Sequence, residues 1–427
     1  MYKNNQSKNN KPGIKSSRQI LEGSNAIAQV VNNIKPAVVS AYPITPQTHI
    51  VEDLAKIKAD ARPPRLYGHS GRGQADFEYI RAESEFAAAS IVAGASATGV
   101  RVYTATSSQG LLLMTEVVFN IAGMRLPIVM TCANRGVSAP ITIWNDHQDA
   151  MTVRDAGWIM LFAENHQEAV AQHILAYKLA ENLKLPVMVN IDGFVLTHSY
   201  EGVVIPTTKE IKKFLPDYKP TKGTYLDTSN PVSLGTFAAP PYYLEIREQL
   251  YQDLANAEDK INAEYNKLVK TIPSVIKVKE KMAKIDDGLI EYYGPNNPKT
   301  VLIALGSMVG TIKDVVDEQN KFSLSNLSSA KIGILKIKCF RPFPAKAVLK
   351  VIKNAKYVAV IEKAVSLGAT DGPLTLEIKS IAHNQTKAKI QNFVVGLGGR
   401  DVTKEMIKKI IVEVKRKDNK IKFVGKS

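Results

Sequence analysis

Residues 100–132 read VRVYTATSSQGLLLMTEVVFNIAGMRLPIVMTC, and this stretch indicates the fold class. Val100–Thr106 and Pro127–Cys132 are short, largely apolar runs of strand length, and Gln109–Ala122 between them has the spacing of an amphipathic helix. Buried strands that alternate with helices are typical of a parallel sheet with helices on both faces. We therefore expect an α/β protein.

The same alternation continues on both sides of this stretch. Further strands are expected at 38–44, 159–163 and 186–192, and further helices at 22–34, 48–58, 85–97 and 167–183. Pro63–Asp76 is rich in Gly, Arg and Pro and is predicted to be a loop. Val203–Pro240 has weak periodicity and is expected to be a connector. Tyr242–Leu268 is predicted to be one long charged helix that packs across a domain or subunit boundary.

A second, smaller α/β unit is expected after this helix. Its strands are predicted at 301–305, 331–340, 357–361 and 393–397, and its helices at 314–319, 345–353, 374–382 and 403–414. The chain of 427 residues is too long for one ordinary core. We expect a basic flexible tail over 1–19, a main domain over 20–240, a helical connector over 241–290 and a second domain over 291–427.

The cysteines and the absence of long apolar segments exclude some classes of protein. Cys132 and Cys339 lie far apart in apolar runs, so we expect two buried thiols, and two thiolates are too few for an iron–sulfur cluster. No segment has the pattern of a signal peptide or a membrane-spanning helix, and we expect a soluble cytoplasmic protein without membrane contact.

The formal net charge is +16, from 56 Lys and Arg against 40 Asp and Glu. Much of the excess lies at the two ends, without interleaved aromatic residues, so we do not expect nucleic-acid binding. Attraction for an acidic protein partner and simple solvation of the two ends both remain open.

Ligands of open parallel sheets bind at the carboxyl ends of the strands, which directs attention to three loops. In the first, Tyr42-Pro43-Ile44-Thr45-Pro46, two prolines stiffen the exit of a strand and leave the Thr45 hydroxyl available. A stiff turn with an ordinary helix cap explains the same pattern.

The other two loops each offer one charged side chain. Glu85 begins an Ala-rich helix and is followed at once by apolar residues, so its carboxylate is expected to be partly buried and to need a partner. A helix-dipole role explains an acid at this position equally well. Arg135 follows a buried strand, where it suits a substrate carboxylate or a structural salt bridge.

Taken together, these motifs resemble one enzyme family. In order and spacing the chain is similar to the alpha subunits of 2-oxoacid:ferredoxin oxidoreductases, and most similar to pyruvate:ferredoxin oxidoreductase (pyruvate synthase). The resemblance covers nearly the whole chain after residue 20 and rests on the following segments: 42–46 (YPITP), 83–89 (ESEFAAA), 104–110 (TATSSQG), 133–136 (ANRG), 144–149 (WNDHQD), 154–158 (RDAGW), 192–198 (DGFVLTH), 341–344 (RPFP) and 362–368 (EKAVSLG).

The resemblance implies a thiamine-diphosphate enzyme that converts pyruvate, coenzyme A and oxidised ferredoxin to acetyl-CoA, CO2 and reduced ferredoxin, or the reverse. The first domain would be the pyrimidine-binding type, and the second would resemble the C-terminal domain of transketolase-like enzymes. Glu85 would hydrogen-bond the aminopyrimidine ring, Tyr42, Pro43, Ile44 and Thr45 would line the cofactor, and Thr45 and Arg135 would position the substrate carboxylate. We assign no role to the loop 146–149, for which a solvated or supporting position is expected.

One expected motif of such enzymes is missing from the chain. Relatives hold the cofactor diphosphate through Mg²⁺ with a Gly-Asp-Gly segment, which does not occur here. The resemblance therefore implies that Mg²⁺ and the [4Fe-4S] clusters lie on partner subunits: a beta subunit with the diphosphate site, and gamma and ferredoxin-like delta subunits. Ferredoxin and coenzyme A would be further partners.

Three alternatives remain at this point. The chain can belong to the same family and act on branched-chain 2-oxoacids or 2-oxoglutarate, or it can serve only in assembly. A nicotinamide-dependent dehydrogenase is disfavoured, because 396–401 (GLGGRD) is not the Gly-x-Gly-x-x-Gly motif. We expect Asp401 in that segment to cap a helix.

Overall fold

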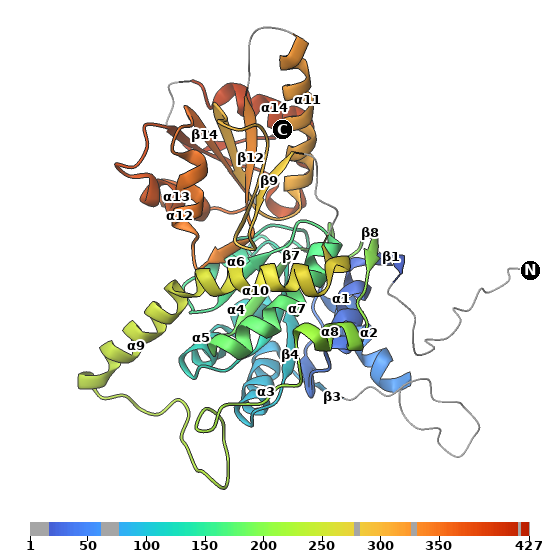
Figure 1. Cartoon of the computed structure of the whole chain (residues 1–427). Coiled ribbons are helices and arrows are strands. Elements are labelled where there is room, and N and C mark those ends of the chain that lie inside the picture. Colours follow the sequence, from blue (N-terminus) through green and yellow to red (C-terminus); the bar gives the residue numbers. More distant parts are fainter. Residues whose placement is uncertain (1–16, 61–76, 277–281, 326–330, 417–419, 427) are drawn as a thin grey trace, which may run out of the picture.

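The computed structural model describes residues 17–60, 77–276, 282–325, 331–416 and 420–426. The predicted loop at 63–76, and all but the last residues of the predicted tail at 1–19, lie outside these residues. Two sheets of seven strands each form separate layers, and the later one sits above the earlier one in Figure 1.

The first sheet carries the strand ends that the sequence singled out. Six of its strands are parallel, and the edge strand β13 runs antiparallel to β6. Across the sheet the order is β13 (Cys339–Arg341), β6 (Ile159–Phe162), β7 (Val187–Asp192), β5 (Val129–Asn134), β4 (Val102–Thr106), β2 (Val38–Ala41) and β3 (Glu78–Arg81).

Helices cover both faces of this sheet, as the apolar strands predicted. One face packs against α1 (Gly23–Ile34), α2 (Thr48–Asp60) and α7 (His166–Leu183). The other packs against α3 (Glu85–Ala97), α4 (Ser108–Leu113) and α5 (Thr115–Gly123). Cys132 and Cys339 are both buried thiols, as expected.

Several expectations for the first half are wrong in detail. The single helix expected at 109–122 is interrupted at Met114 into α4 and α5. The expected connector after residue 203 contains α8 (Thr208–Phe214), and it begins within β8 (Tyr200–Val204), which pairs with β1 (Arg18–Glu22). The long helix is broken at Asn256 into α9 (Pro240–Ala255) and α10 (Ala257–Thr271), and α10 precedes the short 3-10 helix η1 (Pro273–Val275).

The second sheet is mixed. Its five parallel strands are β16 (Lys422–Phe423), β15 (Lys389–Val394), β14 (Tyr357–Glu362), β11 (Thr300–Ala304) and β12 (Ile332–Ile337), followed by the antiparallel strands β10 (Ile290–Tyr293) and β9 (Ala283–Asp286). Its helices are α11 (Met308–Ser325), α12 (Ala345–Ile352), α13 (Pro373–Ala382) and α14 (Lys404–Glu413).

Two further expectations for the second half are wrong. The run at 331–340 is not one strand: β12 ends at Ile337, and β13 joins the first sheet beside β6. Apolar periodicity does not reveal this crossing, because all of β12 and the first two residues of β13 are buried. Thr403, and not Asp401, caps α14, by accepting a hydrogen bond from the Met406 N–H.

The broken helix pair behaves differently in its two halves. The α10 half packs on α7 and α8 beneath the second sheet, whereas α9 extends away from the body (Figure 1). Large side chains stand exposed along α9, namely Tyr242, Tyr243, Leu244, Ile246 and Tyr251. Among the described residues, no helix has the length and apolar character needed to cross a bilayer.

Candidate functional site

The turn at residues 42–46 leaves β2 at the carboxyl edge of the first sheet, and Tyr42, Pro43 and Thr45 are exposed there. Gln47 holds the turn in place: its side-chain amide donates to the Ala105 carbonyl at 2.7 Å and accepts from the Ile44 N–H at 3.2 Å. The exits of β2 and β4 are therefore tied together. The stiff turn predicted from the two prolines is fastened to the neighbouring strand.

Arg135 meets the same turn from β5. Its guanidinium donates to the Thr45 carbonyl at 2.8 Å and to the Thr142 carbonyl at 2.7 Å, which uses two of its five N–H donors. Burial lowers the pKa of Arg135, against the opposing effect of the Asp149 carboxylate. The structure thus brings Arg135 and Thr45 into contact, through the backbone carbonyl of Thr45.

Glu85 is the first residue of α3, which Ser84 caps by accepting the Ala87 N–H at 3.1 Å. As the sequence predicted, its side chain is buried. A Cβ at Gly110 would lie 2.7 Å from the Glu85 Oε1 and 2.6 Å from the Thr106 Oγ1. The absence of a side chain at Gly110 therefore leaves room for the carboxylate.

Buried polar atoms without partners gather on the same segment. In the described part of the chain, the Thr106 hydroxyl and both side-chain amide atoms of Gln109 are buried and make no hydrogen bond. Such groups are costly to bury unless something pairs with them. The Thr106 hydroxyl lies next to Gly110, as the Glu85 carboxylate does. A surface pocket, which Glu85 does not line, is formed by Tyr42 and, nearby in the sequence, by Arg81, Ala82, Glu83, Ala87 and Ile91.

Asp149 organises the strand exits, and sequence reasoning gave it no role. Its buried carboxylate accepts the backbone N–H groups of Ser108 at 3.0 Å and of Arg135 at 2.9 Å, and the Asn134 side-chain amide at 3.0 Å. Burial raises the pKa of Asp149 to about 6. Of the expected positions for the loop 146–149, the solvated one is wrong: three of its four residues are buried.

A second network joins this edge to the later domain. Asp192, at the end of β7, lies 2.8 Å from the His147 imidazole and 2.9 Å from the Lys363 ammonium, and the Ser307 hydroxyl donates to it at 2.5 Å. Burial alone would raise the pKa of Asp192, but Lys363 and His147 hold it well below its usual range. These contacts fix the second domain against the strand exits.

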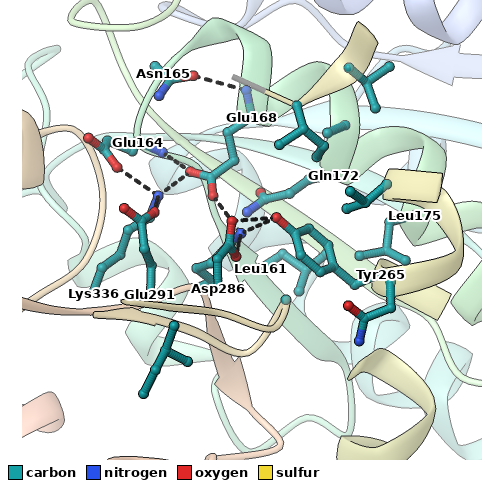
Figure 2. A pocket seen from close by; sticks show the side chains of 18 of the residues that line it. Leu161, Glu164, Asn165, Glu168, Gln172, Leu175, Tyr265, Asp286, Glu291 and Lys336 are labelled. Atoms are coloured by element: carbon teal, nitrogen blue, oxygen red, sulfur yellow. Dashed lines mark hydrogen bonds and ion pairs between the residues drawn. The ribbon is translucent and has the colours of Figure 1, made fainter. Parts of the chain in front are cut away.

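A charged cavity of about 200 Å³ lies elsewhere between the two sheets (Figure 2). Its lining includes the buried Lys336 ammonium, which lies 2.7 Å from both Glu164 and Glu168. Burial would raise the pKa of Glu168, yet Lys336 and Lys338 lower it to about 2. None of the predicted site residues lines this cavity. We interpret the cluster as an electrostatic tie between the domains.

Comparison with known proteins places the chain in a family. The family described as pyruvate flavodoxin/ferredoxin oxidoreductase, thiamine-diphosphate-binding, matches residues 29–266, and pyruvate:ferredoxin oxidoreductase core domain II matches residues 299–407. Pyruvate synthase subunit PorA of Methanocaldococcus jannaschii is 43% identical over 95% of this chain and 97% of its own length. The PorA subunit of Methanosarcina barkeri is 42% identical over 95% of this chain and 94% of its own.

Two further similarities bear on substrate and fold. Ketoisovalerate oxidoreductase subunit VorA of Pyrococcus horikoshii is 35% identical over 93% of this chain and 94% of its own length. A 2-oxoglutarate:ferredoxin oxidoreductase from Magnetococcus marinus shares the fold, with a TM-score of 0.65 at 19% identity over 93% of this chain, which spans 66% of that neighbour's length. The resemblance seen in the sequence is confirmed: the chain belongs to the pyruvate flavodoxin/ferredoxin oxidoreductase family.

Proposed function

We propose that this chain is the subunit of a pyruvate:ferredoxin oxidoreductase complex that forms the aminopyrimidine side of the thiamine diphosphate site. The observation that carries the proposal is the arrangement around Gly110. There the Glu85 carboxylate and the Thr106 hydroxyl lie close against a residue without a side chain, and the Thr106 hydroxyl and the adjacent Gln109 side-chain amide are buried without hydrogen-bond partners. The similarity to pyruvate synthase subunits over nearly the whole chain supports the choice of pyruvate.

Glu85 is the residue that would act on the cofactor. When bound, thiamine diphosphate supplies the electron sink for cleavage of a 2-oxoacid. In a site shielded from water, a hydrogen bond between the Glu85 carboxyl and a ring nitrogen is strong and holds the ring in one tautomer. The N-terminal position in α3 fixes the backbone of Glu85, and Ser84 holds that end of the helix in place.

Arg135 and Thr45 would orient the substrate. Arg135 keeps N–H donors beyond the two that it spends on the Thr45 and Thr142 carbonyls, and such donors suit a carboxylate. Its bond to the Thr45 carbonyl sets the position of the guanidinium against the turn, and Asp149 holds its backbone. Tyr42, Pro43 and Ile44, from the same turn as Thr45, would form the rest of this side of the site. Orientation of this kind lowers the entropic part of the barrier.

Other chains would complete the enzyme. The sequence carries no Gly-Asp-Gly segment for a diphosphate-bound Mg²⁺, and its two cysteines are buried apart. We place Mg²⁺ on a beta subunit and the iron–sulfur clusters on gamma and delta subunits, with ferredoxin and coenzyme A as further partners. The exposed aromatic face of α9 supports contact with another chain, because such faces are usually covered.

A branched-chain 2-oxoacid is the second candidate substrate. The similarity to a ketoisovalerate oxidoreductase subunit favours it, at a lower identity than the pyruvate synthase subunits. Both substrates carry the same 2-oxo and carboxylate groups, so Arg135 and Thr45 serve both equally. The side-chain end of the substrate decides between them.

The test is Glu85→Gln in the assembled complex, assayed by 2-oxoacid- and CoA-dependent reduction of a viologen dye. Loss of the carboxyl is expected to lower the rate by at least about 10²-fold, the usual contribution of such a group. Glu116→Gln is the matched control, because Glu116 also lies in the first turn of a helix but is exposed. Equal activity of the Glu85 variant and the control would refute the assignment. Faster turnover of 2-oxoisovalerate than of pyruvate would favour the second candidate.

A further inference from the structure

Two imidazoles and a carboxylate lie close together near the starts of α1 and α2. They are Glu22, His49 and His198, and one ligand atom of each lies within 4.8 Å of the others. The three residues come from the end of β1, the first turn of α2 and the turn after β7. Elements remote in the sequence therefore bring this set together.

The carboxylate of Glu22 is directed at the histidines. Glu22 occupies the N-cap position of α1 but its side chain makes no capping hydrogen bond. Instead its Oε1 lies 2.7 Å from the His49 Nδ1. A carboxylate at a helix start ordinarily accepts helix N–H groups, so its departure from that role leaves it available as a ligand.

The rings are held by their neighbours. The rings of His49 and His198 contact each other at a tilt of 36° with centroids 4.6 Å apart, and the Phe194 ring contacts His198 with a centroid distance of 4.7 Å. The Nδ1 of His198 lies 2.6 Å from the Thr197 hydroxyl, which also accepts the Phe194 N–H. Metal-binding histidines are commonly fixed through the second ring nitrogen in this way. With Nδ1 donating to Thr197, the lone pair of His198 Nε2 is available.

We propose that Glu22, His49 and His198 form a binding site for a divalent late first-row metal ion, with Zn²⁺ as the best match. Two imidazoles and one carboxylate are a common ligand set for such ions, and three protein ligands leave a position for water. Binding replaces the hydrogen bond between His49 and Glu22, and its proton passes to solvent. The side chain of His49 is 47% exposed, which gives the ion a path of entry.

The site would tie three segments of the first domain together. The ion joins β1 to the start of α2 and to the turn after β7. Since α2 follows directly on the turn at 42–46, the metal stiffens the segment that precedes it in the chain. None of the three metal-binding residues belongs to the cofactor or substrate site, so metal binding can be measured independently of the activity.

The experiment measures zinc in the assembled complex, purified without a histidine tag. Wild type and variants are incubated with ZnCl2, passed through gel filtration and analysed for zinc by mass spectrometry. The wild type is expected to retain one zinc ion more per copy of this chain than His49→Ala or His198→Ala. His383→Ala is the matched control, an exposed histidine of the second domain outside the cluster. Zinc held elsewhere in the complex cancels in these differences.

Thermal unfolding gives a second measurement. Zinc is expected to raise the melting temperature of the wild type and of His383→Ala, but not of His49→Ala, and a chelator should reverse the rise. Because His49 is exposed, its replacement is compatible with folding. Equal zinc content in wild type and His49→Ala would overturn the proposal. A wild type that retains no zinc would do the same and would leave Glu22 and His49 as a hydrogen-bonded pair only.

Discussion

Gly110→Ala tests whether the reaction depends on the position of the Glu85 side chain. The new methyl group would lie 2.7 Å from the Cγ and Oε1 of Glu85 and 2.6 Å from the Thr106 hydroxyl, where ordinary contacts are 3.4–4 Å. The Glu85 side chain must therefore retreat by about 1 Å, a displacement that typically costs about 10²-fold in rate. The overpacking also costs roughly 1–3 kcal/mol of the free energy of unfolding.

The assay is pyruvate-dependent dye reduction by the assembled complex, with denaturant unfolding measured alongside. Gly94→Ala is the matched control, because Gly94 lies within α3 and no atom approaches its Cβ position within 4 Å. This control should keep full activity and gain about 0.5–1 kcal/mol of stability, since Ala favours a helix over Gly. A Gly110→Ala enzyme that folds and works as fast as the control would refute the reasoning.

Two other predictions concern the buried charges. Lys336→Met leaves the Glu164 and Glu168 carboxylates without their shared cation, so the free energy of unfolding should fall by about 3–5 kcal/mol. The control, Lys408→Met, loses an exposed ion pair with Glu318, and its free energy of unfolding should fall by only about 0–1 kcal/mol. A loss equal to that of Lys408→Met in urea titrations would contradict the interdomain tie. Burial raises the pKa of Glu362 to about 7, so the folded state binds a proton that the unfolded state releases near pH 4.5. Stability should fall by about 3 kcal/mol as pH rises from 4.5 to 7, and Glu362→Gln should remove that part of the slope; an unchanged slope would count against it.

The local features of the fold could be predicted from the sequence. The strands predicted at 100–106, 127–132 and 186–192 are found at 102–106, 129–134 and 187–192, and α3 has the predicted bounds. These features depend on spacing and helix-start chemistry within a few residues, which one sequence displays directly. Breaks at Met114 and Asn256 were missed, because no Gly or Pro stands there to mark them.

The site was predicted only in part. Glu85 is buried and Arg135 reaches Thr45, but the roles proposed for them remain predictions. Asp149 was missed because its importance lies in three donors that come from the exits of two different strands, β4 and β5. The same holds for Gly110, whose value appears only when Glu85 is seen opposite.

By itself, the sequence determined the α/β class, the family and the residues at the strand exits, because these follow from periodicity and ordered motifs. Only the tertiary structure decided that β13 crosses to the first sheet, that Lys336 meets Glu164 and Glu168, and that Glu22 meets His49. Those pairings join residues far apart along the chain. They depend on how buried surfaces fit together and on which charges must be paired once water is excluded. The spacing of residues within a short segment does not determine either of these.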